Sequence, residues 1–226
     1  MADDLFTIED ILGRKREEPP EQQLNSAFLS TPRARHLFHR VMSERKLEEL
    51  LPPDLHPGDC LHVISGGDVD SLSYLLWLLR KTSVQKLLIS TWCVSTTDIQ
   101  ELERQFDIGN VGQIDFYVGE ILPGSYPEEY KSICQLCLKT GGRAAVFRNH
   151  SKVMAAIGDR FSFAIESSAN LNTNPRTENT VITIGAEIAD FYFDFFNDIK
   201  SFDKNGEKIR SAKTDRGRTC GNIEFC

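Results

Sequence analysis

The sequence lacks any long apolar run. In 226 residues, no apolar stretch approaches the roughly 20 consecutive residues that a membrane-spanning helix requires. The first ten residues, MADDLFTIED, are acidic and mixed, unlike the basic and then apolar start of a secretory signal peptide. We therefore expect a soluble, cytoplasmic protein without a membrane partner.

Cysteine is also scarce. Six scattered cysteines are too few for a disulfide scaffold. Cys134 and Cys137 form a C-x-x-C pair that could supply half of a zinc site, but they fall at core spacing in a helical pattern. Cys220 and Cys226 have the wrong spacing for the second half. Buried or free thiols are the favoured interpretation, and we expect neither a metal nor a cofactor.

Basic residues are fewer than acidic residues, 26 against 33. The net charge of −7 disfavours tight, purely electrostatic binding to nucleic acid. Basic residues nevertheless gather locally, above all in residues 208–218. A solvated tail is the simpler interpretation. The alternative is a segment that guides a nucleic-acid backbone, with Lys208 and Arg210 as candidate contacts.

The chain length fits one medium domain with extensions. Residues 1–57 are predicted to form an N-terminal extension. It is polar at first and then contains one amphipathic helix, which has Pro32 in its first turn and ends before Pro52. Residues 58–200 are predicted to form an α/β domain, and residues 201–226 a polar, basic tail.

Strand and helix patterns alternate through the first part of this α/β domain. Strands are expected at residues 60–65, 84–92, 113–120 and 143–148, and helices at residues 70–82, 96–110 and 128–142. Such alternation predicts a mixed, largely parallel sheet with helices on both faces. Two apolar runs around Gly158-Asp159 then predict an antiparallel hairpin. A further strand at residues 180–184 and an aromatic-rich helix at residues 186–202 follow.

A glycine-rich turn lies between the first expected strand and helix. Residues 65–71, SGGDVDS, occupy a position where anions often bind. The segment resembles the SGGxDS phosphate loop of ATP pyrophosphatase-type enzymes, with one residue more. A turn that glycine permits is the simpler interpretation, and an ATP-binding enzyme stays an alternative.

Polar groups suited to phosphorus chemistry gather in the hairpin and after it. His150 and Lys152 are two residues apart and so share one face of an extended segment. An imidazole can attack phosphorus covalently, and a lysine and an amide can hold the non-bridging oxygens. A carboxylate can hold the imidazole in one tautomer. Ser168, Asn170 and Glu178 follow in the chain, and the set predicts phosphoryl chemistry without a metal.

These residues resemble the signature of the phospholipase D superfamily, H-x-K-x4-D followed by G-S-x-N. Residues 150–152 read HSK and residues 167–170 read SSAN, while Glu178-Asn179 resembles an E-N segment of the short, single-motif nucleases. The resemblance covers residues 58–200. It implies a phospholipase D-like half-domain and a metal-independent phosphodiesterase, an endonuclease acting on DNA or RNA through a phosphohistidine. The implied catalytic residues are His150, Lys152, Ser168, Asn170 and Glu178, and the implied substrate-binding residues are Ser167 and Asn172.

The motif occurs once, whereas two copies build one active site in that superfamily. The resemblance therefore implies a homodimer in which two His150 side chains face each other across a twofold axis. One imidazole would be the nucleophile. The other would be the general acid for the leaving oxygen and then the base for water.

The sequence departs from the signature at two positions. Ile157 occupies the place of the aspartate, and Ser167 that of the glycine. Asp159, two residues beyond Ile157, would face the same side of an extended strand and is a candidate substitute. The alternative function is a catalytically weakened module that binds nucleic acid or a phosphate ligand. His150 and Lys152 would then be ordinary strand residues or ligand contacts.

Overall fold

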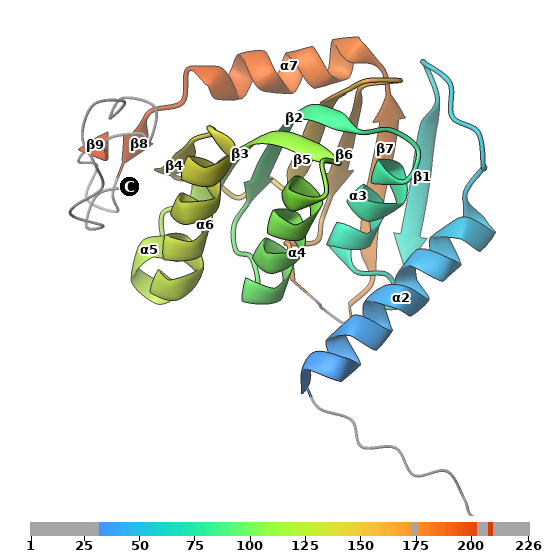
Figure 1. Ribbon diagram of the computed structural model, residues 1–226, viewed down its shortest axis with the longest axis horizontal. Helices are drawn as coiled ribbons and strands as arrows, with labels where there is room; N and C mark the ends of the chain where they lie inside the picture. The colour runs from blue at the N-terminus through green and yellow to red at the C-terminus, as the bar shows by residue number, and fades with distance from the viewer. Residues whose placement is uncertain (1–31, 173–175, 203–207, 210–226) are drawn as a thin grey trace, which may run out of the picture. The chain divides into compact units, whose positions relative to one another are not determined.

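The computed structural model describes residues 32–172, 176–202 and 208–209. A seven-stranded sheet with the order β1-β7-β6-β5-β2-β3-β4 forms its centre (Figure 1). The strands are β1 (Cys60–Ser65), β2 (Val84–Thr91), β3 (Val111–Gly119), β4 (Ala144–Phe147), β5 (Val153–Gly158), β6 (Phe163–Ser167) and β7 (Glu178–Ile184).

The sheet is mixed. β2 pairs in parallel with β3, and β3 with β4, while β5, β6, β7 and β1 join by antiparallel pairing. β1, β2, β3, β4 and β6 therefore run in one direction and β5 and β7 in the other. The predicted α/β class with a mixed, largely parallel sheet is confirmed, and the hairpin around Gly158-Asp159 is β5–β6.

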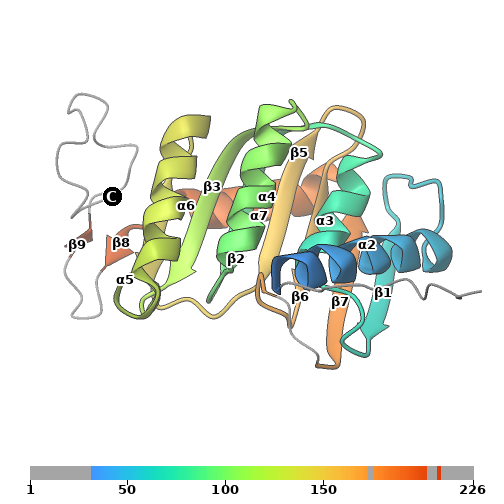
Figure 2. The same ribbon diagram turned by 60° about the horizontal axis from the view of Figure 1, so that its bottom comes forward.

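Helices cover both faces of this sheet, as Figures 1 and 2 show. One face carries α3 (Ser71–Leu79), α4 (Thr96–Asp107), α5 (Leu122–Ser125) and α6 (Pro127–Thr140), with α2 (Pro32–Leu50) packed on α3. The other carries α7 (Ala186–Asn197). Residues alternate along β2, so Leu87 and Ile89 join the larger core while Leu88 packs with Phe193 and Phe196 of α7.

Side chains at the helix starts fix α2 against the domain. Asp70 caps α3 by accepting a hydrogen bond from the Ser73 amide at 3.0 Å, and Ser95 caps α4. The buried Arg40 of α2 donates to the carboxylates of both Asp70 and Asp98. This bridge ties α2 to the starts of α3 and α4, and the described residues from Pro32 onward form one compact unit.

Two small features complete the described chain. β8 (Ser201–Phe202) pairs with β9 (Lys208–Ile209), and β8 contacts β4. Cys134 and Cys137 lie on α6 with both side chains buried in the larger core. Within the described ranges, no helix is long and apolar enough to cross a membrane.

Candidate active site

The residues predicted to be catalytic lie at one edge of the sheet. The parallel-running strands end at this carboxyl edge, and β5 and β7 begin there. The register brings the strand ends side by side, with Ser65 opposite Glu178 and Val153 between Ser90 and Glu166. Open α/β sheets bind ligands outside such an edge. The loops that carry H-S-K and S-S-A-N both emerge at this edge.

His150 and Lys152 lie together in the loop between β4 and β5. The Lys152 ammonium is 3.0 Å from Nδ1 of His150 and donates to the His150 carbonyl oxygen at 2.6 Å. The imidazole is exposed, and its ring centroid lies 5.8 Å from that of Trp92. The loop thus presents an imidazole and an ammonium as one unit.

The buried Asn149 holds this loop in place. Its Nδ2 donates to Ser90 Oγ at 2.9 Å and to the Tyr117 carbonyl oxygen at 2.8 Å. Its Oδ1 accepts from the amide of Ser151 at 3.0 Å and from Ser151 Oγ at 2.7 Å. All four hydrogen-bonding positions of the amide are therefore used. Asn149 was not among the predicted site residues, although a polar residue directly before H-x-K in a β-prone run was a usable signal.

The Trp92 ring packs beside the His150 imidazole. Trp92 follows β2, is partly buried, and its ring lies against Gly119 at the end of β3. A Cβ atom at Gly119 would come within 2.7 Å of Trp92 Cδ1. Glycine at position 119 therefore lets the indole lie beside His150. The sequence contains no motif that points to this pair.

Glu178, the first residue of β7, is engaged by Ser168. Ser168 Oγ donates to the Glu178 carboxylate, and its backbone amide donates to the Asn179 carbonyl oxygen at 3.0 Å. The sequence pattern predicts that a carboxylate holds the imidazole in one tautomer. In the described chain Glu178 instead bonds to Ser168, and the ammonium of Lys152 contacts the imidazole.

Lys152 lies between two further groups of the site. Burial lowers the pKa of its ammonium, and the Cys93 sulfur, when ionised, and the Glu178 carboxylate partly offset that effect. Burial likewise raises the pKa of the Cys93 thiol, which the nearby Lys152 counteracts. Lys152 is therefore a partly desolvated cation beside the His150 imidazole.

Asn170 and Asn172 bring buried amides to the same edge. Leu171 between them is buried and pairs with Val94, which anchors the segment beside the end of β2. The Oδ1 atoms of both asparagines are buried and accept no hydrogen bond within the described residues. Asn172 Nδ2 lies 3.6 Å from Cys93 Sγ. Two buried amide oxygens at this edge therefore lack a donor within the described residues.

The remaining substrate-binding candidates are spread more widely. Ser167, the last residue of β6, contacts Thr180 Oγ1 at 2.9 Å. Lys208 lies on β9, which pairs with β8 beside β4. Arg210 lies outside the described residues.

Neither Ile157 nor Asp159 belongs to the site. Asp159 accepts hydrogen bonds from Ser83 Oγ at 2.5 Å and Gln85 Nε2 at 3.0 Å, at the opposite edge of the sheet. The suggestion that Asp159 replaces the motif aspartate is therefore wrong. Ile157 is partly buried against the α7 core, five residues and roughly 17 Å along the strand from Lys152.

The SGGDVDS turn also emerges at the carboxyl edge, where α2 covers it. Ser43 Oγ donates to the Asp68 carbonyl oxygen at 3.1 Å, and Lys46 pairs with the Asp68 carboxylate. That carboxylate also accepts a hydrogen bond from the Gly66 amide at 3.2 Å. A carboxylate thus occupies the place where a phosphate loop offers free amides, and this geometry gives ATP binding no support.

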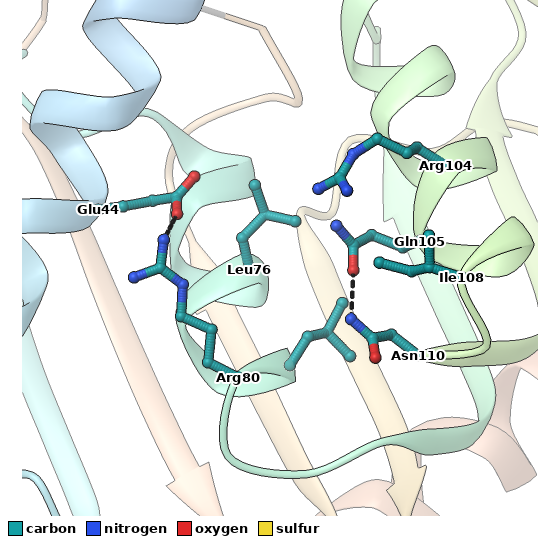
Figure 3. Close-up of a pocket in the computed structure, with 8 residues that line it drawn as sticks. Glu44, Leu76, Arg80, Arg104, Gln105, Ile108 and Asn110 are labelled. Carbon is teal, nitrogen blue, oxygen red and sulfur yellow. Dashed lines mark hydrogen bonds and ion pairs between the residues drawn. The ribbon is translucent and has the colours of Figure 1, made fainter.

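A cavity of about 140 Å³ lies between α2, α3 and α4, away from these residues (Figure 3). Leu79 and Arg80 at the end of α3 and Asn110 before β3 place it towards the other edge of the sheet. Its Arg80 pairs with Glu44, and Asn110 donates to Gln105 at 2.8 Å. Because its polar groups are largely satisfied by one another, the cavity is the weaker candidate for a ligand site.

Comparison with known proteins gives similarity at the level of structure alone. No family model and no curated protein matches the chain. Polyphosphate kinase from Porphyromonas gingivalis matches 75% of this chain and 31% of its own, with 18% identity and a TM-score of 0.49. TrmBL2 is described as an archaeal chromatin protein with a novel mode of DNA binding. The match covers 72% of this chain and 58% of TrmBL2, with 11% identity and a TM-score of 0.44.

A third solved structure, NucT from Helicobacter pylori, covers 62% of this chain and 94% of its own, with 13% identity and a TM-score of 0.45. The chain thus spans about a third of the kinase and just over half of TrmBL2. Similarity at these scores does not identify an activity.

Proposed function

We propose that the chain is a metal-independent phosphodiesterase of the phospholipase D type that cleaves DNA or RNA. The observation that carries the proposal is the contact between Lys152 and Nδ1 of His150 at the carboxyl edge of the sheet. The hydrogen-bonded Ser168–Glu178 pair lies at the same edge. The H-S-K, S-S-A-N and E-N segments support the same assignment by their resemblance to the superfamily signature.

In the proposed reaction, Lys152 and the Asn170 amide hold the non-bridging oxygens of the phosphate. Nε2 of His150 forms a bond to phosphorus while the phosphorus–oxygen ester bond breaks. Lys152 must leave Nδ1 for a phosphate oxygen in this step, so that Nδ1 carries the ring proton and Nε2 has a free lone pair. Water then attacks phosphorus, and the bond to Nε2 breaks.

A second copy of the chain completes the proposed site. The single H-x-K supplies one imidazole, and the leaving oxygen needs a proton donor. A homodimer places a second His150 across the twofold axis. That imidazole gives its proton to the leaving oxygen and takes one back from the attacking water.

Hydrolysis in the presence of EDTA tests the enzymatic proposal. Wild-type protein should hydrolyse bis-(p-nitrophenyl) phosphate and an oligonucleotide, and His150→Ala and His150→Asn should abolish both reactions. His56→Ala is the matched control, because His56 is an exposed histidine before β1, away from the carboxyl edge. Absence of EDTA-resistant hydrolysis by wild type would make the proposal wrong.

One observation favours a second candidate, a binding module without turnover. Glu178 bonds to Ser168, so the carboxylate that should orient the imidazole is engaged elsewhere. A chain that keeps Lys152 and the asparagine amides but lacks that orientation would still hold a phosphate. Oligonucleotide binding that weakens steeply with salt, without cleavage, would support this candidate.

A further inference from the structure

Two exposed arginines occupy the same two loops as the candidate site. Arg148 lies two residues before His150 in the loop after β4, and Arg176 lies two residues before Glu178, where β7 begins. Neither guanidinium forms a hydrogen bond or an ion pair with any residue in the described part of the chain. Two free cations therefore flank His150 and Glu178.

This freedom sets the two apart from the other arginines. Each of the other arginines whose side chains the structure describes donates to a carboxylate or a carbonyl: Arg40, Arg45, Arg80, Arg104, Arg143 and Arg160. The chain carries a net charge of −7, so carboxylates are abundant as partners. Among the arginines whose side chains are described, those without a partner lie at this one edge. This distribution indicates that the edge meets an external anion.

The local acids do not cancel these charges. Asp68 pairs with Lys46, and Asp70 pairs with Arg40. Glu178 accepts from Ser168 and lies near Lys152, and Glu166 accepts from the Tyr192 hydroxyl. Glu120 lies just beyond the end of β3. Phosphodiester groups suit the free guanidiniums because arginine binds phosphate oxygens with two parallel hydrogen bonds.

The fold also explains why Arg148 faces outwards. Asn149 is only 5% exposed and its side chain points into the sheet, where Ser90 and Tyr117 bind it. Its neighbours Arg148 and His150 are both exposed. The buried Asn149 therefore directs both the His150 imidazole and the Arg148 guanidinium towards solvent.

We propose that Arg148 and Arg176 bind the phosphates on either side of the phosphate that His150 and Lys152 contact. The substrate class is then a nucleic-acid strand with several consecutive phosphates, as opposed to a lipid or an isolated phosphodiester. The inference rests on the proposed function for the identity of the central phosphate. The flanking contacts themselves require only that a strand binds.

Substrates of two sizes test the inference. Arg148→Ala, Arg176→Ala and the double variant are compared on bis-(p-nitrophenyl) phosphate and on a single-stranded oligonucleotide. For the oligonucleotide, KM should rise about tenfold per arginine at low salt, as expected for a charge-assisted phosphate contact. The salt slope of binding should fall by roughly 0.7 per arginine. Kinetics on bis-(p-nitrophenyl) phosphate, which has no flanking phosphates, should not change.

Arg160→Ala is the matched control. Arg160 is exposed, but it donates to the Lys81 carbonyl oxygen at the opposite edge of the sheet. If the site variants resemble this control in oligonucleotide KM and salt slope, the inference is overturned while the phosphodiesterase stands. An equal loss on both substrates would also overturn it, because the arginines would then act on the central phosphate.

Failure of the proposed function gives a different pattern. If wild type hydrolyses neither substrate, oligonucleotide binding by fluorescence anisotropy replaces the kinetics. Binding that weakens in Arg148→Ala and Arg176→Ala, but not in Arg160→Ala, supports the flanking contacts in a module without turnover. Binding that is unchanged in all three variants, or absent in wild type, overturns the inference.

Discussion

The Lys152 ammonium lies 3.0 Å from Nδ1 of His150. An ammonium group can only donate, so Nδ1 accepts this hydrogen bond and the neutral ring carries its proton on Nε2. Nucleophilic attack through Nε2 requires the other tautomer. The resting arrangement therefore makes the tautomer of His150 depend on where Lys152 points.

This dependence predicts a tautomer change on anion binding. Nitrogen-15 NMR of the free protein should show His150 protonated on Nε2. Inorganic phosphate at saturating concentration should draw Lys152 to its oxygens and move the ring proton to Nδ1. Lys152→Met removes the donor and should leave a mixture of tautomers that phosphate no longer shifts. An identical His150 spectrum with and without phosphate in the wild type would contradict the proposed switch.

The pH dependence of the reaction should report Lys152. Burial lowers the pKa of this ammonium, and the proposed role requires its charged form. The alkaline limb of kcat/KM should therefore lie below the range of an exposed lysine, about 10.4. Lys152→Arg keeps the charge and should move this limb to higher pH. A wild-type limb at or above the range of an exposed lysine would count against the role.

The same shift affects folding stability. Between the folded and the unfolded pKa of Lys152, the unfolded chain binds more protons, so stability rises with pH across that window. Lys152→Met should remove this rise. Urea unfolding at several pH values measures it, and an unchanged slope in the variant would assign the rise to another group.

Asn149 should matter for both stability and rate. Asn149→Asp keeps an acceptor for Ser151 but turns a carboxylate oxygen towards the Tyr117 carbonyl oxygen, which Nδ2 now reaches at 2.8 Å. Loss of this buried hydrogen bond should cost about 1–3 kcal/mol in urea unfolding. Because the loop also positions His150, kcat should fall more than KM rises.

Ser151→Ala is the milder comparison for Asn149. It removes the hydroxyl contacts with Asn149 Oδ1 at 2.7 Å and with Ser90 Oγ at 2.6 Å, but keeps the backbone amide that donates to Asn149 Oδ1. It should retain most of the activity and most of the stability. Equal losses in Asn149→Asp and Ser151→Ala would show that the hydroxyl, and not the full set of amide contacts, holds the loop.

The fold was predictable because its signals are local. The alternation of apolar runs with capped helices gave the order of the elements, and Gly158-Asp159 marked the hairpin that reverses β6 against β5. The pairing of β1 with β7, more than 100 residues apart in the chain, had no such local signal. Register between distant strands depends on packing, which no short motif reports.

The candidate site was predictable only in part, for a related reason. His150 and Lys152 were found because their spacing is a motif, and the structure places them in contact. Asn149 and Trp92 were missed because their roles depend on Ser90, Tyr117 and Gly119, which are distant in the sequence. Because alternate residues of a strand share one face, Asp159 was predicted to replace the motif aspartate at position 157. However, β5 ends before Asp159, at the opposite edge of the sheet.

Position 157 should determine stability and not activity. Ile157 is partly buried against the α7 core and pairs with Lys86 in the register, roughly 17 Å along β5 from Lys152. Ile157→Asp would restore the residue type of the superfamily signature while placing a carboxylate in a largely apolar contact. Its unfolding free energy should fall by about 1–3 kcal/mol, with Lys86 limiting the loss. Its kcat should stay within about threefold of wild type below the unfolding transition. A tenfold gain in kcat would instead show that the aspartate acts on the site through the length of the strand, and that the chain is a weakened enzyme.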